Sequence, residues 1–153
     1  MKKSFKTQKG VEAQNKDLVK KYYTDLDKTE NRELDKFIEK YISRNFVLHL
    51  PGGLEIKGKE GLKEYYASSK EAFSDGTHTV NAIIVESNMV AFRATAKAKH
   101  LGTFMGIQPS GQEFTTTFAG FWKLDNGKII EWWSEYDALG MMMQLGMELK
   151  MKE

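Results

Sequence analysis

The residue types and spacing best suited to chemistry lie near the carboxyl end of the chain. The segment from 131 to 137 places three carboxylates among three aromatic side chains: Glu131, Trp132, Trp133, Glu135, Tyr136 and Asp137. A carboxylate surrounded by aromatic rings is costly to keep ionised. A carboxyl group in such a place is suited to take or give a proton near neutral pH. Acid–base chemistry is therefore expected here first, although these residues do not identify a substrate.

Two of these carboxylates have structural alternatives. Asp137 comes directly before a predicted helix, where an aspartate accepts hydrogen bonds from the first free backbone N–H groups. Glu131 could instead form an ion pair with Arg93 across the sheet. We expect Asp137 and Glu131 as general acid or base, and the helix cap and the ion pair stay open as alternatives.

Two of the three histidines are expected to take part in the chemistry. An imidazole can carry a proton or polarise a carbonyl group, and this role is expected for His49 and His100. The alternative for each is a hydrogen-bonded structural side chain. His78 stands at the start of a strand and is given no chemical role. No two histidines have the spacing of a chelating pair, so no metal site is predicted.

Length and composition indicate one ordinary globular domain. The chain has 153 residues, 41% hydrophobic and 29% charged, with a net charge of +2, so neither a nucleic acid nor a membrane is predicted as a partner. The absence of cysteine excludes disulfides, thiolate metal sites and a cysteine nucleophile. Neither a secretory leader nor a membrane-spanning apolar run is found. We expect a flexible basic tail over residues 1–10, one domain over 11–153 and a cytoplasmic location.

Apolar residues at helical spacing predict three helices in the first half of the chain. They cover residues 11–26, 32–42 and 58–73, and the third is expected to end at Ser74-Asp75-Gly76 through a glycine stop signal. A fourth helix, rich in methionine, is expected over residues 138–150. Methionines in such a helix are more typical of adaptable packing than of a cofactor site.

Between and after these helices the pattern changes to that of strands. A short strand over residues 45–50 turns at Pro51-Gly52-Gly53 and pairs with residues 54–57. Longer strands follow at 79–85 and 89–100. A glycine-rich loop over residues 101–112 then leads to a hairpin around Asp125-Asn126-Gly127.

Helices segregated from antiparallel strands predict an α+β fold. In the hairpin both alternate sets of side chains are apolar, with Phe114, Phe118, Trp122 and Leu124 in one set and Ala119 and Phe121 in the other. Both faces of the sheet are therefore expected to be covered, one of them by the helices.

Motifs in the second half of the chain resemble those of a known family. Arg93 lies in a strand that leads to the loop HLGTFMGIQPSG, residues 100–111; DNGKIIEWWSEYD follows at 125–137, and QLG at 144–146. In this order and spacing the motifs resemble the SnoaL-like polyketide cyclase (ester cyclase) family of the nuclear-transport-factor-2-like superfamily. His49, just before the Pro-Gly-Gly turn, fits an early histidine of that family.

The resemblance implies a cone-shaped fold, in which a curved antiparallel sheet wraps around N-terminal helices and encloses a pocket, often in a homodimer. It also implies intramolecular aldol chemistry by acid–base catalysis without metal or cofactor. Two residues depart from the family pattern. Trp122 stands where many relatives have arginine, and Ser134 stands where aspartate is frequent.

The expected function is that of a cofactor-free enzyme of the cyclase or isomerase type, acting on a small hydrophobic carbonyl compound. Asp137 or Glu131 would remove a proton next to the carbonyl, and His49 or His100 would stabilise the enolate oxygen. The side chains expected to bind the substrate are Tyr65, Arg93, Phe118, Trp122 and Trp133. Two alternatives stay open: a pocket that binds a small molecule without chemistry, and a scaffold that pairs through its sheet as a homodimer.

Overall fold

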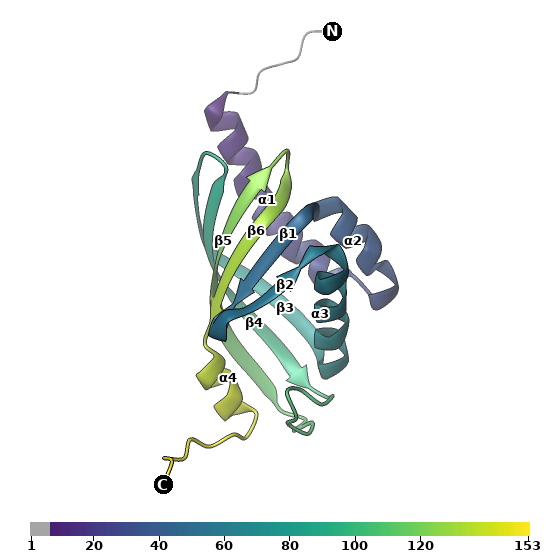
Figure 1. The fold of residues 1–153 in the computed structure, drawn as a ribbon, viewed down its shortest axis with the longest axis vertical. Helices are drawn as coiled ribbons and strands as arrows, with labels where there is room; N and C mark the ends of the chain where they lie inside the picture. The colour runs from purple at the N-terminus through teal and green to yellow at the C-terminus, as the bar shows by residue number, and fades with distance from the viewer. Residues whose placement is uncertain (1–6) are drawn as a thin grey trace.

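A six-stranded sheet that curves around helices forms the framework of the molecule (Figure 1). The computed structural model describes residues 7–153. The strands follow the order β2-β1-β6-β5-β4-β3. Within the described residues no ladder joins the β2 and β3 edges, so the cone formed by the sheet stays open on one side. The α+β fold predicted from the sequence is confirmed.

All neighbouring strands pair antiparallel except β1 and β6, which run parallel. The prediction of a wholly antiparallel sheet is wrong in this one pairing. The first and last long strands are joined by most of the chain rather than by a hairpin, so their relative direction is free to be parallel. The strands are β1 Ile42–Leu50, β2 Leu54–Lys57, β3 Phe73–Glu86, β4 Met89–His100, β5 Glu113–Asp125 and β6 Lys128–Tyr136.

Three helices from the first half of the chain pack against the concave face of the sheet. The first begins after Thr7, whose Oγ1 accepts a hydrogen bond from the backbone N–H of Gly10 at 3.3 Å. Residues 8–10 therefore belong to this helix and not to the predicted tail, while residues 1–6 lie outside the described part. The helices are α1 Gln8–Lys28, α2 Leu34–Tyr41, α3 Gly58–Ala72 and, at the far end of the sheet, α4 Ala138–Gln144.

The helices and the inner face of the sheet share one aromatic core centred on Tyr22. Its hydroxyl lies 2.5 Å from that of Tyr66, which joins α1 to α3. Its ring centroid lies 4.9 to 6.0 Å from five other ring centroids, and all five rings meet it edge-to-face at interplanar angles of 62° to 88°: Tyr23, Phe37, Tyr41, Trp122 and Trp132. Edge-to-face pairs add to the stabilisation that burial alone supplies.

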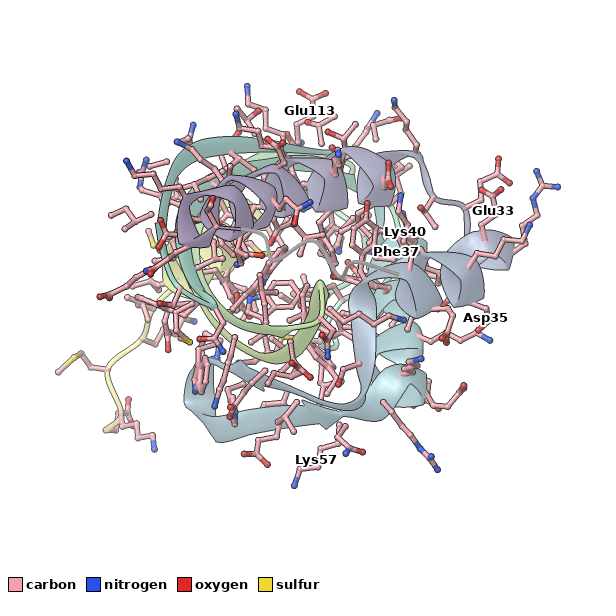
Figure 2. All side chains as sticks on the ribbon, turned by 90° about the horizontal axis from the view of Figure 1, so that it is seen from above. Glu33, Asp35, Phe37, Lys40, Lys57 and Glu113 are labelled. Carbon is pink, nitrogen blue, oxygen red and sulfur yellow. The ribbon has the colours of Figure 1, made fainter. Side chains whose placement is uncertain are left out.

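The view from above shows the same division between interior and surface (Figure 2). Side chains crowd the space inside the curve of the sheet, whereas the charged side chains of Glu33, Asp35, Lys57 and Glu113 lie at the periphery. The core therefore lies between helices and sheet, and the outer face of the sheet turns away from it.

The end of α3 differs from the prediction. The helix ends at Ala72 and β3 begins at Phe73, so Ser74-Asp75-Gly76 belongs to the strand instead of stopping the helix. The register of β3 against β4 shifts between Ser74 and Thr77, and Asp75 has a φ of 54°. The segment therefore forms an irregularity of the ladder rather than a helix end, and the positive φ falls on Asp75 instead of Gly76.

The last helix is shorter than predicted because Gly146 closes it. Gly146 has a φ of 97°, and its N–H donates to the carbonyl of Met143 at 3.1 Å. The N–H of Met147 donates to the carbonyl of Met142 at 3.0 Å. These two bonds form a Schellman motif, which ends the helix at Gln144 rather than near residue 150.

The hairpin between β5 and β6 is confirmed, since Asn126 and Gly127 both have positive φ, 48° and 76°. The expectation that both faces of this hairpin are covered is not met in the single chain. Trp122 and every second residue next to it along β5 face the core. Phe121, on the outer face, is 50% exposed.

No helix within residues 7–153 is both long enough and apolar enough to cross a bilayer. The cytoplasmic location stays a prediction.

Replacing Gly120 with alanine should destabilise the fold. A Cβ atom at Gly120 would lie 2.3 Å from Cζ of Phe92, which is buried on β4 directly opposite. Crowding of this kind in a core costs about 1–3 kcal/mol, and we expect a loss of that size in the free energy of unfolding measured by urea denaturation. Gly76→Ala is the matched control, because a Cβ there meets nothing within 4 Å. Adding Phe92→Leu to Gly120→Ala should relieve part of the crowding, and strictly additive effects would contradict this explanation.

Candidate functional site

A cavity of about 710 Å³ opens between the inner face of the sheet and helices α1 and α3. A cavity of this size suits a small organic molecule. Its walls combine polar side chains with many aromatic rings, those of Tyr23, Tyr65, Tyr66, Phe73, Phe104, Phe114, Phe118, Trp132 and Tyr136. The cavity is the candidate functional site.

Other parts of the described chain are weaker candidates for a functional site. A second hollow, of about 760 Å³, lies between α1 and the turns around residues 88 and 126. The described residues that line it include no histidine and no aromatic ring, so it lacks the apolar walls and the base of the first cavity. Within residues 7–153 no group of three or more histidine or acidic side chains is arranged to hold a metal ion.

His78 and Asp27 form a hydrogen-bonded pair on the wall of the aromatic cavity. Nδ1 of His78, on β3, lies 2.5 Å from Oδ1 of Asp27, near the end of α1, and the backbone N–H of His78 donates to Oδ2 at 2.8 Å. An ionised carboxylate only accepts hydrogen bonds, so in the neutral ring Nδ1 carries the proton and Nε2 keeps its lone pair. The two side chains are only 23% and 20% exposed. An imidazole with this tautomer can act as a general base through Nε2.

Aromatic neighbours hold the His78 ring in place. Its centroid lies 5.1 Å from that of Tyr23 and 5.9 Å from that of Phe118. His78 received no chemical role from the sequence, because its partner Asp27 is 51 residues away and no local motif links them. The signals that could have found the pair were an acid at the end of a predicted helix and a histidine at the start of a predicted strand.

Buried polar groups adjoin the cavity. Burial raises the pKa of the Tyr22, Tyr23 and Tyr66 phenols well above the ordinary value. Tyr66 is hydrogen-bonded to Tyr22, but the Tyr23 hydroxyl and Nε1 of Trp132 are buried with no hydrogen-bond partner among the described residues. Unpaired polar atoms are costly to bury, so a polar ligand atom that reaches either group would offset that cost.

His49 and Glu131 are brought together, but on the outer face of the sheet. Nε2 of His49 lies 3.0 Å from Oε1 of Glu131, and Nδ1 lies 3.2 Å from Oε1 of Glu55. The imidazole stacks on Trp133 with ring centroids 5.3 Å apart. None of these four side chains lines the cavity. In the described part of the chain Glu131 also makes no ion pair with Arg93.

A β-bulge explains why Glu131 faces outward. The register between β5 and β6 passes over Ile130, because Ile129 pairs with Leu124 while Glu131 pairs with Lys123. One extra residue exchanges the two faces of a strand for every position beyond it. After the bulge the side chains that line the cavity are those of Trp132, Ser134 and Tyr136.

Asp137 caps α4. Its Oδ1 accepts a hydrogen bond from the backbone N–H of Gly140 at 2.8 Å, and its side chain is exposed and outside the cavity lining. The helix cap considered for Asp137 is therefore formed, and its position gives no support to a role as the base.

His100 is fully buried at the end of β4. Its Nδ1 accepts a hydrogen bond from the backbone N–H of Ser110 at 3.2 Å and lies 3.1 Å from Oγ of the same serine. The backbone N–H of Gly111 also donates to the carbonyl of His100, at 2.9 Å. His100 thus ties the loop of residues 101–112 to the sheet, and it does not line the cavity.

The five predicted substrate-binding side chains are divided between the two faces of the sheet. Phe118 and Tyr65 line the cavity. Trp122 is fully buried in the core beside it, whereas Arg93 and Trp133 lie on the outer face. Of the predicted site, the structure therefore places two aromatic side chains where a ligand in the cavity would meet them.

Comparison with known proteins agrees with this architecture. A sequence model of SnoaL-like polyketide cyclases matches residues 17–145. The chain belongs to this family. The structure of IdmH from Streptomyces antibioticus, for which a polyketide cyclase activity has been suggested, has a TM-score of 0.73 to this chain at 28% sequence identity. The match covers 88% of this chain and 99% of IdmH.

Other members of this fold have been linked to other roles. AclR from Streptomyces galilaeus, suggested to be a hydroxylase, has a TM-score of 0.77 at 24% identity. The match covers 93% of this chain and 87% of AclR. A phenazine biosynthesis-related protein from Pseudomonas aeruginosa has a TM-score of 0.75 at 18% identity. The match covers 95% of this chain and 94% of that protein. The comparison with curated proteins gave no match. Family and fold support a cyclase or isomerase type of role in general, and the substrate depends on the cavity.

Both departures from the SnoaL-like pattern lie at or beside the cavity. Ser134 lines it, and the ring of Trp122 lies 4.9 Å from the rings of Tyr22 and Phe92 in the adjoining core. The acid that is frequent in relatives at the position of Ser134 is thus absent from the cavity wall. The acidic side chains that do line the cavity are those of Asp27 and Asp75.

Ionisation of the buried tyrosines should require unfolding. Because burial raises the pKa of Tyr22, Tyr23 and Tyr66 in the folded chain, the unfolded chain releases these protons at lower pH. Their contribution to stability is full below about pH 10 and falls as the pH rises further. After a rapid jump to about pH 12, phenolate absorbance should appear in a fast phase and in a slow phase that matches the loss of circular dichroism. Tyr66→Phe should reduce the slow phase alone, whereas complete ionisation before the loss of structure would contradict the prediction.

Proposed function

We propose that the protein is an enzyme of the cyclase or isomerase type that moves a proton on a small hydrophobic carbonyl compound held in the cavity, without a cofactor. The observation that carries this proposal is the His78–Asp27 pair on the cavity wall. Family membership supports the general type of reaction. In this proposal the His78–Asp27 pair serves as the base. Asp137, Glu131 and His49 are not in a position to do so, because they lie outside the cavity lining.

In the proposed reaction, Nε2 of His78 takes a proton from the carbon next to the carbonyl group. Asp27 holds the ring in the required tautomer and stabilises the imidazolium that forms. The negative charge moves to the carbonyl oxygen, and hydroxyl groups of Tyr65, Tyr136 and Ser134 line the same cavity as hydrogen-bond donors. The enolate carbon then attacks a second carbonyl of the same molecule, or the proton returns to a different carbon.

The base can be tested before a substrate is known. 5-Nitrobenzisoxazole loses its C–H proton to a base in an apolar cavity, and its N–O bond breaks to give a coloured phenolate. The wild-type protein should accelerate this elimination, and His78→Gln should lower the rate by about 10²- to 10⁴-fold. Asp27→Asn should cause a smaller loss, because Nε2 remains but the ring is no longer oriented.

Asp137→Asn and His49→Gln are the matched controls for this experiment, since both side chains lie outside the cavity lining. Both variants should keep the wild-type rate. A His78→Gln variant that is folded and fully active would contradict the proposal, and loss of activity in Asp137→Asn would restore the base predicted from the sequence.

A second candidate function is binding without chemistry, favoured by the serine at position 134 on the cavity wall. In that case the cavity would bind 5-nitrobenzisoxazole without accelerating its elimination. The same assay, run together with a direct binding measurement, separates the two functions.

We further propose that the chain forms a homodimer through the outer face of its sheet. In the register of β3 to β6, an apolar row crosses four strands, made by Ile84, Ala91, Phe121 and Trp133. Ile84 is 73% exposed and Phe121 is 50% exposed. Large exposed apolar side chains that adjoin one another are typical of interaction surfaces.

The charges around this row suit a second copy of the chain. Arg93 lies on the β4 side, and Glu131 and Glu135 lie on the β6 side, with β5 between them. A two-fold axis parallel to β5 would set the basic side of one copy against the acidic side of the other. Arg93 of one copy and Glu135 of the other would thus face each other beside the apolar row.

Phe121→Glu should break this dimer, because it places a charge in the centre of the apolar row. We expect the dissociation constant, measured by analytical ultracentrifugation, to rise by about 100-fold. Leu54→Glu changes an equally exposed leucine, 58% accessible on β2, that lies outside the row and should leave the dimer intact. A wild-type chain that is monomeric at micromolar concentration would contradict the proposal.

A further inference from the structure

Lys70 lies on the cavity wall with a backbone carbonyl as its hydrogen-bond partner. Its Nζ donates to the carbonyl of Leu26 at 3.3 Å, and its side chain belongs to the cavity lining. No ion pair joins Lys70 to a carboxylate within residues 7–153. Lys63, on the same helix, differs in this respect because it pairs with Asp35 at 2.7 Å.

These surroundings make the uncharged amine of Lys70 easier to form than that of an exposed lysine. Burial lowers the pKa of Lys70 below its ordinary value, although the charge of Asp27 acts in the opposite direction. Lys63 shows the reverse, because its hydrogen bond to Asp35 raises its pKa. The neutral amine is the form of lysine that attacks a carbonyl carbon.

We propose that Lys70 forms a reversible imine with the carbonyl group of a ligand bound in the cavity. The inference rests on the proposed function, in which the ligand is a carbonyl compound and His78 moves protons. Amine and base come from α3 and β3, and both line the same cavity. The ligand class is aldehydes and ketones joined to an uncharged aromatic or aliphatic group, because the walls include rings such as Phe118 and Trp132.

Each step of imine formation balances without an external reagent. The lone pair of Nζ attacks the carbonyl carbon, so a C–N bond forms while the π electrons of the C=O bond move to oxygen. His78 transfers one proton from nitrogen to that oxygen and gives a carbinolamine. The hydroxyl group then leaves with the second N–H proton as water, and a C=N bond remains. Nothing is oxidised or reduced.

The imine would make the proposed base more effective. A protonated C=N group withdraws electrons from the neighbouring carbon more strongly than a C=O group does, so the α proton is more acidic. His78 would then remove that proton to give an enamine, which is the nucleophile of an aldol-type closure. Hydrolysis of the product imine returns Lys70 and the carbonyl compound.

Reductive trapping tests the inference on the full chain. The protein is incubated with 2-naphthaldehyde and sodium cyanoborohydride, which reduces an imine to a stable secondary amine, and the labelled lysine is located by peptide mass spectrometry. Lys70 should carry at least about tenfold more label than Lys63. Equal labelling of the two lysines would overturn the inference.

Two matched variants check that the label reports the amine and not the fold. Lys70→Met keeps the length of the side chain and should lose the dominant label while its thermal unfolding stays close to wild type. Lys63→Met should keep the dominant label. If Lys70→Met does not fold, Lys70→Arg retains the charge and removes the reactive primary amine. A dominant label that survives either change at position 70 would overturn the inference.

The elimination assay separates this inference from the proposed function. If the wild-type chain accelerates the elimination but Lys70 is not preferentially labelled, the imine inference is overturned. The proposal that His78 is the base then still stands. Preferential labelling of Lys70 without elimination supports the imine and removes His78 as the base. When both are seen, His78→Gln should slow the elimination by about 10²- to 10⁴-fold and also slow the labelling of Lys70.

Discussion

The contacts of one buried ring, that of Tyr22, determine the shape of the interior. Tyr22 meets the rings of Phe37 on α2 and of Trp122 and Trp132 on β5 and β6, and its hydroxyl is bonded to Tyr66 on α3. These contacts fix three helices against one side of a curved sheet and fill one end of it. The cavity adjoins this core, since Tyr66 and Trp132 contact Tyr22 and also line the cavity.

Most of the fold could be predicted because it follows from local periodicity. Helical spacing of apolar residues found α1, α2 and α3, and the Asn126-Gly127 pair found the hairpin. The errors arose where one residue changes a whole element or where a pairing joins distant segments. Gly146 adopts positive φ and closes α4 early, and the parallel pairing of β1 with β6 joins segments that are far apart in the chain, for which short-range patterns carry no information.

The site was harder to predict than the fold, for two physical reasons. The bulge at Ile130 exchanges the faces of β6, so the carboxylate of Glu131 lies outside and the hydroxyl of Ser134 lies inside. The pair of Asp27 and His78 depends on the packing of α1 against β3, which no motif records. In this SnoaL-like chain the proposed base, its carboxylate partner and Lys70 therefore come from β3, α1 and α3, whereas the family motifs drew attention to β6 and its flanks.

The molecule also contains a second, smaller apolar cluster, separate from the one around Tyr22. It joins Phe114 on β5 to Met141 and Leu145 at the end of the chain. Phe114 and Met141 also line the cavity, so the cavity is bordered by both clusters. A cluster of few residues opens at a lower free energy than a large core does. The end of the cavity next to α4 is therefore held by far fewer apolar contacts than the end next to Tyr22, and it is the part of the wall that gives way at the lower free energy.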